Sequence, residues 1–194
     1  MFRSLNVTTQ QQSLTELANV AKRGMTDERV VMTARTIVQG CSARNDFCEL
    51  QAIYEAVKHG HARVAGLEKG VRYVSDPTTA DFFTGPRKLL DMCEQGACAE
   101  DCDGHAALIM ALAGSIGFRV GARAYGPTAG GPLTHVYAVA LLPKHPEDEF
   151  GSSANNADKV VALDTTVPSF RFGSEPPPGR VLTAWIGALP RRSK

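Results

Sequence analysis

Three residues of types that together transfer acyl groups are spaced along this chain: Cys102, His135 and Asp164. Cys102 opens the apolar run "CDGHAALIMALAGS", whose pattern predicts a buried helix. A thiol in the first turn of a helix lies beside unpaired backbone N–H groups and the positive end of the helix dipole, and both favour the thiolate. We therefore predict that Cys102 is a nucleophile.

A cysteine nucleophile needs a base and a group that orients the base. His135 lies near the start of the strand-like run "LTHVYAVALL", and Asp164 lies near the end of a second such run, "DKVVALDT". If these strands are antiparallel neighbours, the carboxylate can hold the imidazole in one tautomer while the other ring nitrogen faces the helix. The three residues are thus predicted to form a Cys-His-Asp triad.

An acyl-transfer site also needs donors for the oxyanion. The backbone N–H of Cys102 is the first candidate, and the side chain of Gln95 is a weaker second one. Asp103 and His105, in the first turn of the same helix, are further candidates for contacts with substrate or oxyanion. His105 has the alternative of facing the polar side of the helix, and Tyr137 is expected to be a core residue.

Other interpretations of the cysteines are a buried inert thiol at position 102 or a zinc site. The zinc interpretation would use Cys41, Cys48, Cys93, Cys98, Cys102, His59 and His61. The spacings lack the paired short knuckles of structural zinc sites, so no metal is predicted. Five cysteines at irregular spacing favour reduced thiols over a disulfide framework, and any pairing scheme leaves one thiol free. Cys98 is expected to pack inertly or to form a reversible disulfide with Cys102.

The first third of the chain is predicted to supply helices. Ser13 with Glu16 three residues later is typical of a capping box for "LTELANVAKR", with Gly24 as a left-handed end. Thr26 is expected to cap "DERVVMTARTIVQ", and Asn45 to cap "DFCELQAIYEAVKH".

The later part of the chain favours strands after one more helix. Pro86 suits the first turn of "GPRKLLDMCEQG", and the alternating runs "FRVGARAY", "LTHVYAVALL" and "DKVVALDT" indicate three strands. The loop "GPTAGGP" is expected to lie over a site, and Trp185 to pack the C-terminal segment onto the body. Helices followed by an antiparallel sheet predict an α+β class.

Length and charge limit the function classes. The 194 residues suit one domain, with a flexible or docking arm over 1–12, a helical lead-in over 13–60 and a catalytic core over 61–190. Lys and Arg number 21 against 20 for Asp and Glu, so neither nucleic acid nor an anionic bilayer is an expected partner. No signal peptide or membrane span is visible, which predicts a cytoplasmic protein.

Three segments carry the triad candidates: "EDCDGHAALIMALAGSIGFRVGARAY", "THVYAVALL" and "VVALDTTVP". Together they resemble the transglutaminase-like superfamily of the papain-like cysteine enzymes, over roughly residues 45 to 180. The segments "LDTTVP" and "EPPPG" also resemble a bacterial subgroup found in phages and prophages. The acidic lead-in Glu100-Asp101 departs from the plain glycine-rich one of the family, and the calcium-binding loops of animal transglutaminases have no counterpart.

The resemblance implies a papain-like core whose nucleophile helix packs against the sheet, and it needs no cofactor. It implies that Cys102 attacks an amide carbonyl, that His135 acts as base and then as acid, and that Asp164 orients His135. Water or a second amine then resolves the thioester, with a protein or peptide as substrate. The alternative function is a silent binding or structural module of the same fold, for example in a phage particle.

Overall fold

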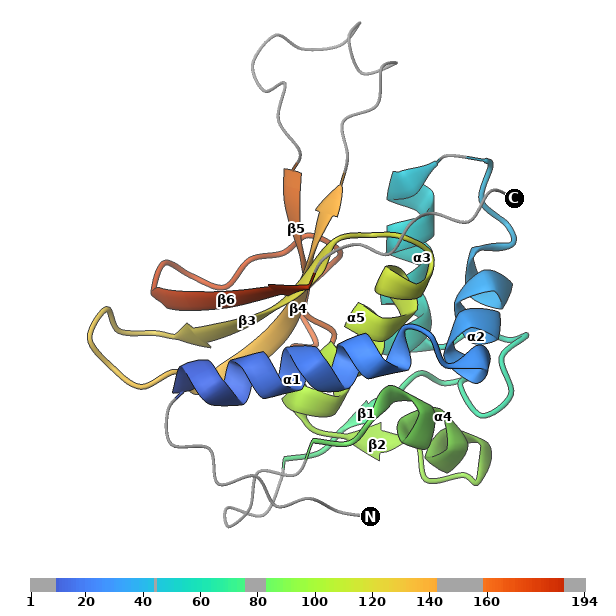
Figure 1. Cartoon of the computed structure of the whole chain (residues 1–194), viewed down its shortest axis with the longest axis horizontal. Coiled ribbons are helices and arrows are strands. Elements are labelled where there is room, and N and C mark those ends of the chain that lie inside the picture. The colour runs from blue at the N-terminus through green and yellow to red at the C-terminus, as the bar shows by residue number, and fades with distance from the viewer. Residues whose placement is uncertain (1–9, 44, 76–82, 143–158, 187–194) are drawn as a thin grey trace, which may run out of the picture.

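The computed structural model describes residues 10–43, 45–75, 83–142 and 159–186, and within them the fold is mixed α+β. A four-stranded antiparallel sheet lies on one side of a central helix and further helices lie on the other side, whereas the N-terminal helix contacts both the central helix and the sheet (Figure 1). Within the described residues, the helices are too short or too polar to cross a membrane. Of the expected N-terminal arm, residues 1–9 lie outside the described residues, whereas residues 10–12 are already helical.

The first helix differs from its prediction at both ends. Helix α1 (Gln10–Gly24) begins before Ser13, so Ser13 is not its cap, because the polar run of glutamines joins the helix. Gly24 ends the helix but does not adopt a left-handed conformation. A side chain on Gly24 would come within 2.8 Å of the Pro86 ring, so the glycine is needed for close packing instead.

Caps define the next two helices. Helix α2 (Glu28–Val38) is capped by Asp27 rather than by Thr26, because the Asp27 carboxylate accepts hydrogen bonds from the backbone N–H groups of Arg29 and Val30. Helix α3 (Asp46–His59) has the predicted cap, since Asn45 Oδ1 accepts from the N–H of Cys48 at 3.0 Å. Gly60 then stops α3 with a φ of 103°, as its position predicted.

The central helix α5 (Cys102–Ser115) is buried on every side over residues 104–114, so the prediction of a buried helix is confirmed. It packs against strands of the sheet and against α1, α2, α3 and α4 (Pro86–Glu94), which explains why its sequence is apolar all round rather than along one face. Pro86 occupies the first turn of α4, as predicted. Because α5 is enclosed, the position of Cys102 at its start is fixed by the whole core.

The main sheet has the strand order β5-β4-β3-β6, with all neighbours antiparallel. Its strands are β3 (Val120–Gly126), β4 (His135–Leu142), β5 (Lys159–Leu163) and β6 (Arg180–Ile186). The first three were predicted, and the antiparallel pairing of β4 with β5 is confirmed. The fourth was missed as a strand, because it follows a proline-rich stretch. It pairs with β3 over its full length and carries Trp185.

Two short strands and one hairpin loop complete the surroundings of α5. Strand β1 (Arg72–Tyr73) pairs in parallel with β2 (Ala99–Glu100), directly before Cys102. The loop "GPTAGGP" joins the neighbouring strands β3 and β4 as a hairpin connection. The loop between β4 and β5 lies outside the described residues.

The cysteines correct the prediction of reduced thiols. Cys41 forms a disulfide with Cys48, and Cys93 forms one with Cys98. Four of the five cysteines considered as zinc ligands are therefore disulfide-bonded. Cys98 pairs with Cys93 rather than with Cys102. Spacing alone did not reveal these pairs, since connectivity depends on the fold. The remaining cysteine, Cys102, is a free thiol.

Candidate active site

The structure brings His135 and Asp164 into direct contact. The Nε2 atom of His135 lies 2.7 Å from Oδ2 of Asp164, although 29 residues separate them in the chain. His135 opens β4, and Asp164 directly follows the end of β5 beside it. Since Nε2 is bound to the carboxylate, Nδ1 is the ring nitrogen that remains for proton transfer.

Asp164 is held as a buried carboxylate. Its Oδ1 accepts hydrogen bonds from the backbone N–H and the hydroxyl of Thr166, at 3.0 and 2.7 Å. Burial raises the pKa of this carboxyl, but the hydrogen bonds from His135 and Thr166 outweigh burial and hold the pKa below its ordinary value. Asp164 is therefore ionised at neutral pH and able to orient the imidazole.

The loop after Asp164 is anchored to helix α3. The hydroxyl of the fully buried Tyr54 donates a hydrogen bond to the carbonyl of Phe170 at 2.9 Å. The ammonium of Lys58 donates to the carbonyls of Val167, at 2.9 Å, and of Phe170. These bonds fix the path of the chain beyond β5, and so they help to place Asp164.

Cys102 opens α5, whose cap is the preceding Asp101. The Asp101 carboxylate accepts from the backbone N–H groups of Asp103 and Gly104 at 2.9 and 3.1 Å. The backbone N–H groups of Cys102 itself and of Val136 lie close to the sulfur and lower its pKa. These two N–H groups favour negative charge on the sulfur. Val136 was not predicted for this role, because its contribution comes from the backbone.

The thiol itself is neutral in the structure. Burial raises the pKa of Cys102 to about 12, and the Asp103 carboxylate adds to this effect. The thiol donates a hydrogen bond to Oδ1 of Asp103 at 3.8 Å. The backbone N–H of Cys102 at the helix N-terminus lowers the pKa of its thiol, as predicted, but burial and the Asp103 carboxylate raise it by more. The prediction that the position of Cys102 favours the thiolate is therefore wrong.

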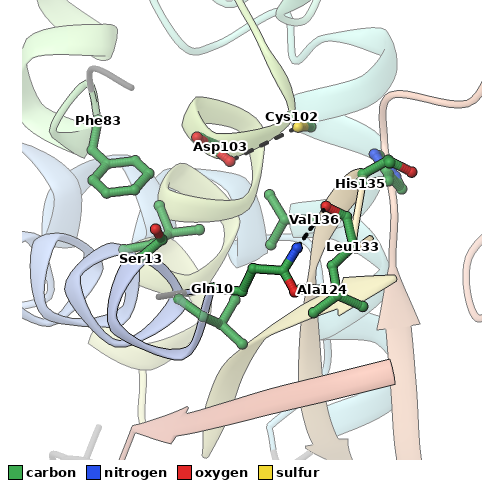
Figure 2. A pocket seen from close by; sticks show the side chains of 12 residues that line it. Gln10, Ser13, Phe83, Cys102, Asp103, Ala124, Leu133, His135 and Val136 are labelled. Atoms are coloured by element: carbon green, nitrogen blue, oxygen red, sulfur yellow. Dashed lines mark hydrogen bonds between the residues drawn. The ribbon is translucent and has the colours of Figure 1, made fainter. Parts of the chain in front are cut away.

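Cys102 and His135 line one cavity, which has a volume of about 350 Å³. Asp103 and Val136 lie beside them in its wall, and Phe83 and Ser13 lie across the cavity from His135 (Figure 2). Asp164 stands behind His135, with its side chain fully enclosed. The arrangement places a thiol, an imidazole and an orienting carboxylate where a reacting carbonyl could enter.

His105 and Gln95, the other candidates, do not line this cavity. Gln95 is exposed at the C-terminal end of α4, within the loop that the Cys93–Cys98 disulfide closes. His105 is 1% exposed, and its Nδ1 lies 2.8 Å from the hydroxyl oxygen of Thr165. His105 therefore ties the nucleophile helix to the residue after Asp164, which neither of its two sequence interpretations foresaw.

Two tyrosines complete the surroundings: the prediction that Tyr137 is a core residue is confirmed, and Tyr73 was not singled out from the sequence. Tyr137 is 2% exposed, as a core residue should be, and its hydroxyl donates to Glu175 at 2.9 Å. Its ring stacks on that of His135 with centroids 5.9 Å apart. Tyr73 of β1 was overlooked, although its ring lies 6.4 Å from that of His105. Burial raises the pKa of Tyr73, and the nearby Asp101 and Asp103 carboxylates add to this effect.

Protonation of His105 should make the fold sensitive to acid. Burial lowers the pKa of His105 to about 4, whereas an unfolded histidine titrates near about 6.5. Between these values the unfolded chain binds a proton that the folded chain does not. The unfolding free energy is therefore expected to fall by about 3 kcal/mol as the pH drops through this window. Urea unfolding at a series of pH values measures the loss.

The variant His105→Gln should lose this pH dependence, whereas His59→Gln, at an exposed site on α3, should retain it. Equal slopes in the wild type and in His105→Gln would show that another group takes up the proton.

Removing the charge of Asp103 should activate the thiol. In Asp103→Asn the pKa of Cys102 falls, because the anion that opposes the thiolate is gone. Alkylation of Cys102 by iodoacetamide below that pKa should accelerate on the order of tenfold for each unit by which the pKa falls. Peptide mass spectrometry after timed exposure gives the rate.

The matched variant Glu55→Gln removes an acidic charge on α3 and should leave the rate unchanged. A slower reaction in Asp103→Asn would instead mean that Asp103 assists formation of the thiolate.

Comparisons with protein-family models, with curated proteins and with solved structures find no match for this chain.

Proposed function

We propose that this protein is a cysteine-dependent amide hydrolase or acyltransferase with a transglutaminase-like, papain-like core. The observation that carries the proposal is the 2.7 Å contact between His135 and Asp164, together with the lining of one cavity by His135 and the free thiol of Cys102. Each of the three groups comes from a different element of the α+β fold. Their combination matches the needs of nucleophilic catalysis: a nucleophile, a base and a group that orients the base.

The proposed reaction begins with transfer of the thiol proton from Cys102 to Nδ1 of His135. Because the pKa of the resting thiol is about 12, this transfer accompanies attack rather than preceding it. The sulfur forms a bond to the amide carbonyl carbon, and the carbonyl electrons move to oxygen, next to the N–H groups of Cys102 and Val136. The C–N bond then breaks as His135 returns the proton to the leaving amine.

A thioester on Cys102 remains. Water attacks the thioester while giving its proton to His135, and the thiol is released together with a carboxylic acid. If a second amine attacks instead, the product is a new amide. The proposed substrates are proteins or peptides, and the resemblance to phage and prophage proteins suggests a larger assembly as the biological setting.

Acylation by an activated ester tests the proposal. Para-nitrophenyl acetate should release a burst of nitrophenolate and leave an acetyl group on Cys102, which peptide mass spectrometry can locate. The variant His135→Ala should lose the burst. Acetyl groups spread over lysines, with Cys102 unmodified, would contradict the proposal.

The second candidate function is a silent binding or structural module of the same fold. The raised pKa of Cys102 favours it, because a resting neutral thiol is a poor nucleophile. Leu133 and Thr134, at the end of the β3–β4 loop, also line the cavity. Complete absence of acylation in a folded protein would support this second function.

A further inference from the structure

Six of the twelve described residues that line the cavity beside Cys102 are apolar. Its described apolar lining consists of Leu14, Leu17, Phe83, Ala124, Leu133 and Val136. A volume of about 350 Å³ lies near the lower end of the range for small-molecule pockets, about 300 to 1,000 Å³. The space therefore suits one side chain or acyl chain together with the reacting carbonyl.

Apart from the imidazole of His135, the ionisable side chain at the described wall beside the thiol is the carboxylate of Asp103. The described lining includes the Asp103 carboxylate but no lysine or arginine. An acyl group that carries a carboxylate would lose its water among apolar side chains and would face the Asp103 anion. Anionic acyl groups are thus opposed by both burial and repulsion.

The polar groups at the α1 side of the cavity are neutral. Gln10 and Ser13 stand on the first turns of α1, and Gln10 Nε2 contacts the carbonyl of Leu133 at 3.5 Å (Figure 2). This contact joins the start of α1 to the segment that leads into β4. A cationic acyl chain that reaches the α1 side of the cavity would contact neutral and apolar groups and no carboxylate, because Asp103 lies beside the thiol.

We propose that this cavity is the acyl-group site and that it selects an uncharged, apolar acyl chain or side chain. The inference rests on the proposed function, since it assigns the group that becomes attached to Cys102. Helix α1 is then part of the substrate site, because it supplies Leu14 and Leu17 to the apolar lining and Ser13 to the polar lining.

A series of para-nitrophenyl esters provides the test. The acyl groups are acetate, hexanoate, hemisuccinate and aminohexanoate, and each rate is divided by the rate of the same ester with free mercaptoethanol. We expect hexanoate to acylate Cys102 about tenfold faster than acetate, the scale on which buried methylene groups affect specificity. Hemisuccinate and aminohexanoate should react more slowly than hexanoate. Equal or faster reaction of either charged ester would overturn the inference.

The variant Ser13→Phe fills the cavity from α1 and should lower the ratio of the hexanoate rate to the acetate rate to about one or below. Asn19→Phe, on the exposed side of the same helix, is the matched control and should behave as the wild type. If acetate reacts but Ser13→Phe keeps the preference, this inference fails and the proposed function stands. If no ester acylates Cys102 in the wild type, both fail together.

Discussion

Replacing Cys102 with alanine is expected to abolish acyl transfer while leaving the fold intact. The change removes one sulfur atom and no helix cap, because Asp101 caps α5. Loss of the nucleophile from a serine-protease triad costs about 10⁶ in kcat, and a loss of that order would bring turnover below detection. Burst amplitude with an activated ester, with circular dichroism as the measure of folding, checks the result.

The control for this experiment replaces two cysteines outside the cavity. In the double variant Cys41→Ser, Cys48→Ser, the disulfide at the start of α3 is lost, and Cys102 and its cavity are unchanged. This variant should keep the burst. If Cys102→Ala retained hydrolysis at the wild-type rate, a different residue would perform the chemistry and the triad would be wrong.

Replacing Asp164 with asparagine should have the next largest effect. The asparagine amide can donate a hydrogen bond to Nε2 of His135, and the imidazole proton would then sit on Nδ1. A protonated Nδ1 cannot accept the proton of the Cys102 thiol, as the proposed reaction requires. The same exchange in a serine-protease triad costs about 10⁴ in kcat, and we expect a loss of that order with a smaller change in KM. Steady-state rates at several substrate concentrations separate kcat from KM.

Thr166→Val is the matched variant for Asp164. It removes the hydroxyl that donates to Oδ1 at 2.7 Å, but the carboxylate and its contact with His135 remain. We expect its kcat to fall by no more than about a hundredfold, since a hydrogen bond to a charged group contributes about 1.5 to 3 kcal/mol. A loss in Thr166→Val as large as in Asp164→Asn would indicate that the position of the loop, rather than the carboxylate, controls the rate.

Local patterns were enough to predict much of the architecture. Caps and stop residues such as Asn45, Pro86 and Gly60 act within one turn of a helix, and alternation along a strand reports burial of one face. The pairing of His135 with Asp164 was also predictable, because both lie where two neighbouring strands meet.

Features that depend on contacts between distant segments were not predictable. Gln10 and Leu133 are 123 residues apart, so nothing local indicates that α1 borders the cavity. The pKa of Cys102 depends on how deeply its thiol is buried, and the helices and strands that pack around α5 determine that burial. The hydrogen bond between His105 and Thr165 likewise requires α5 and the end of β5 to be packed together.

The disulfide between Cys93 and Cys98 has a consequence for handling the protein. It closes a small ring immediately before β2, and β2 leads directly into Cys102. Reductants that are routinely added to preserve a cysteine nucleophile would open this ring as well, so purification buffers can alter the site they are meant to protect. In unreduced, denatured samples, a thiol reagent should count one sulfhydryl per chain, which makes the protein its own concentration standard.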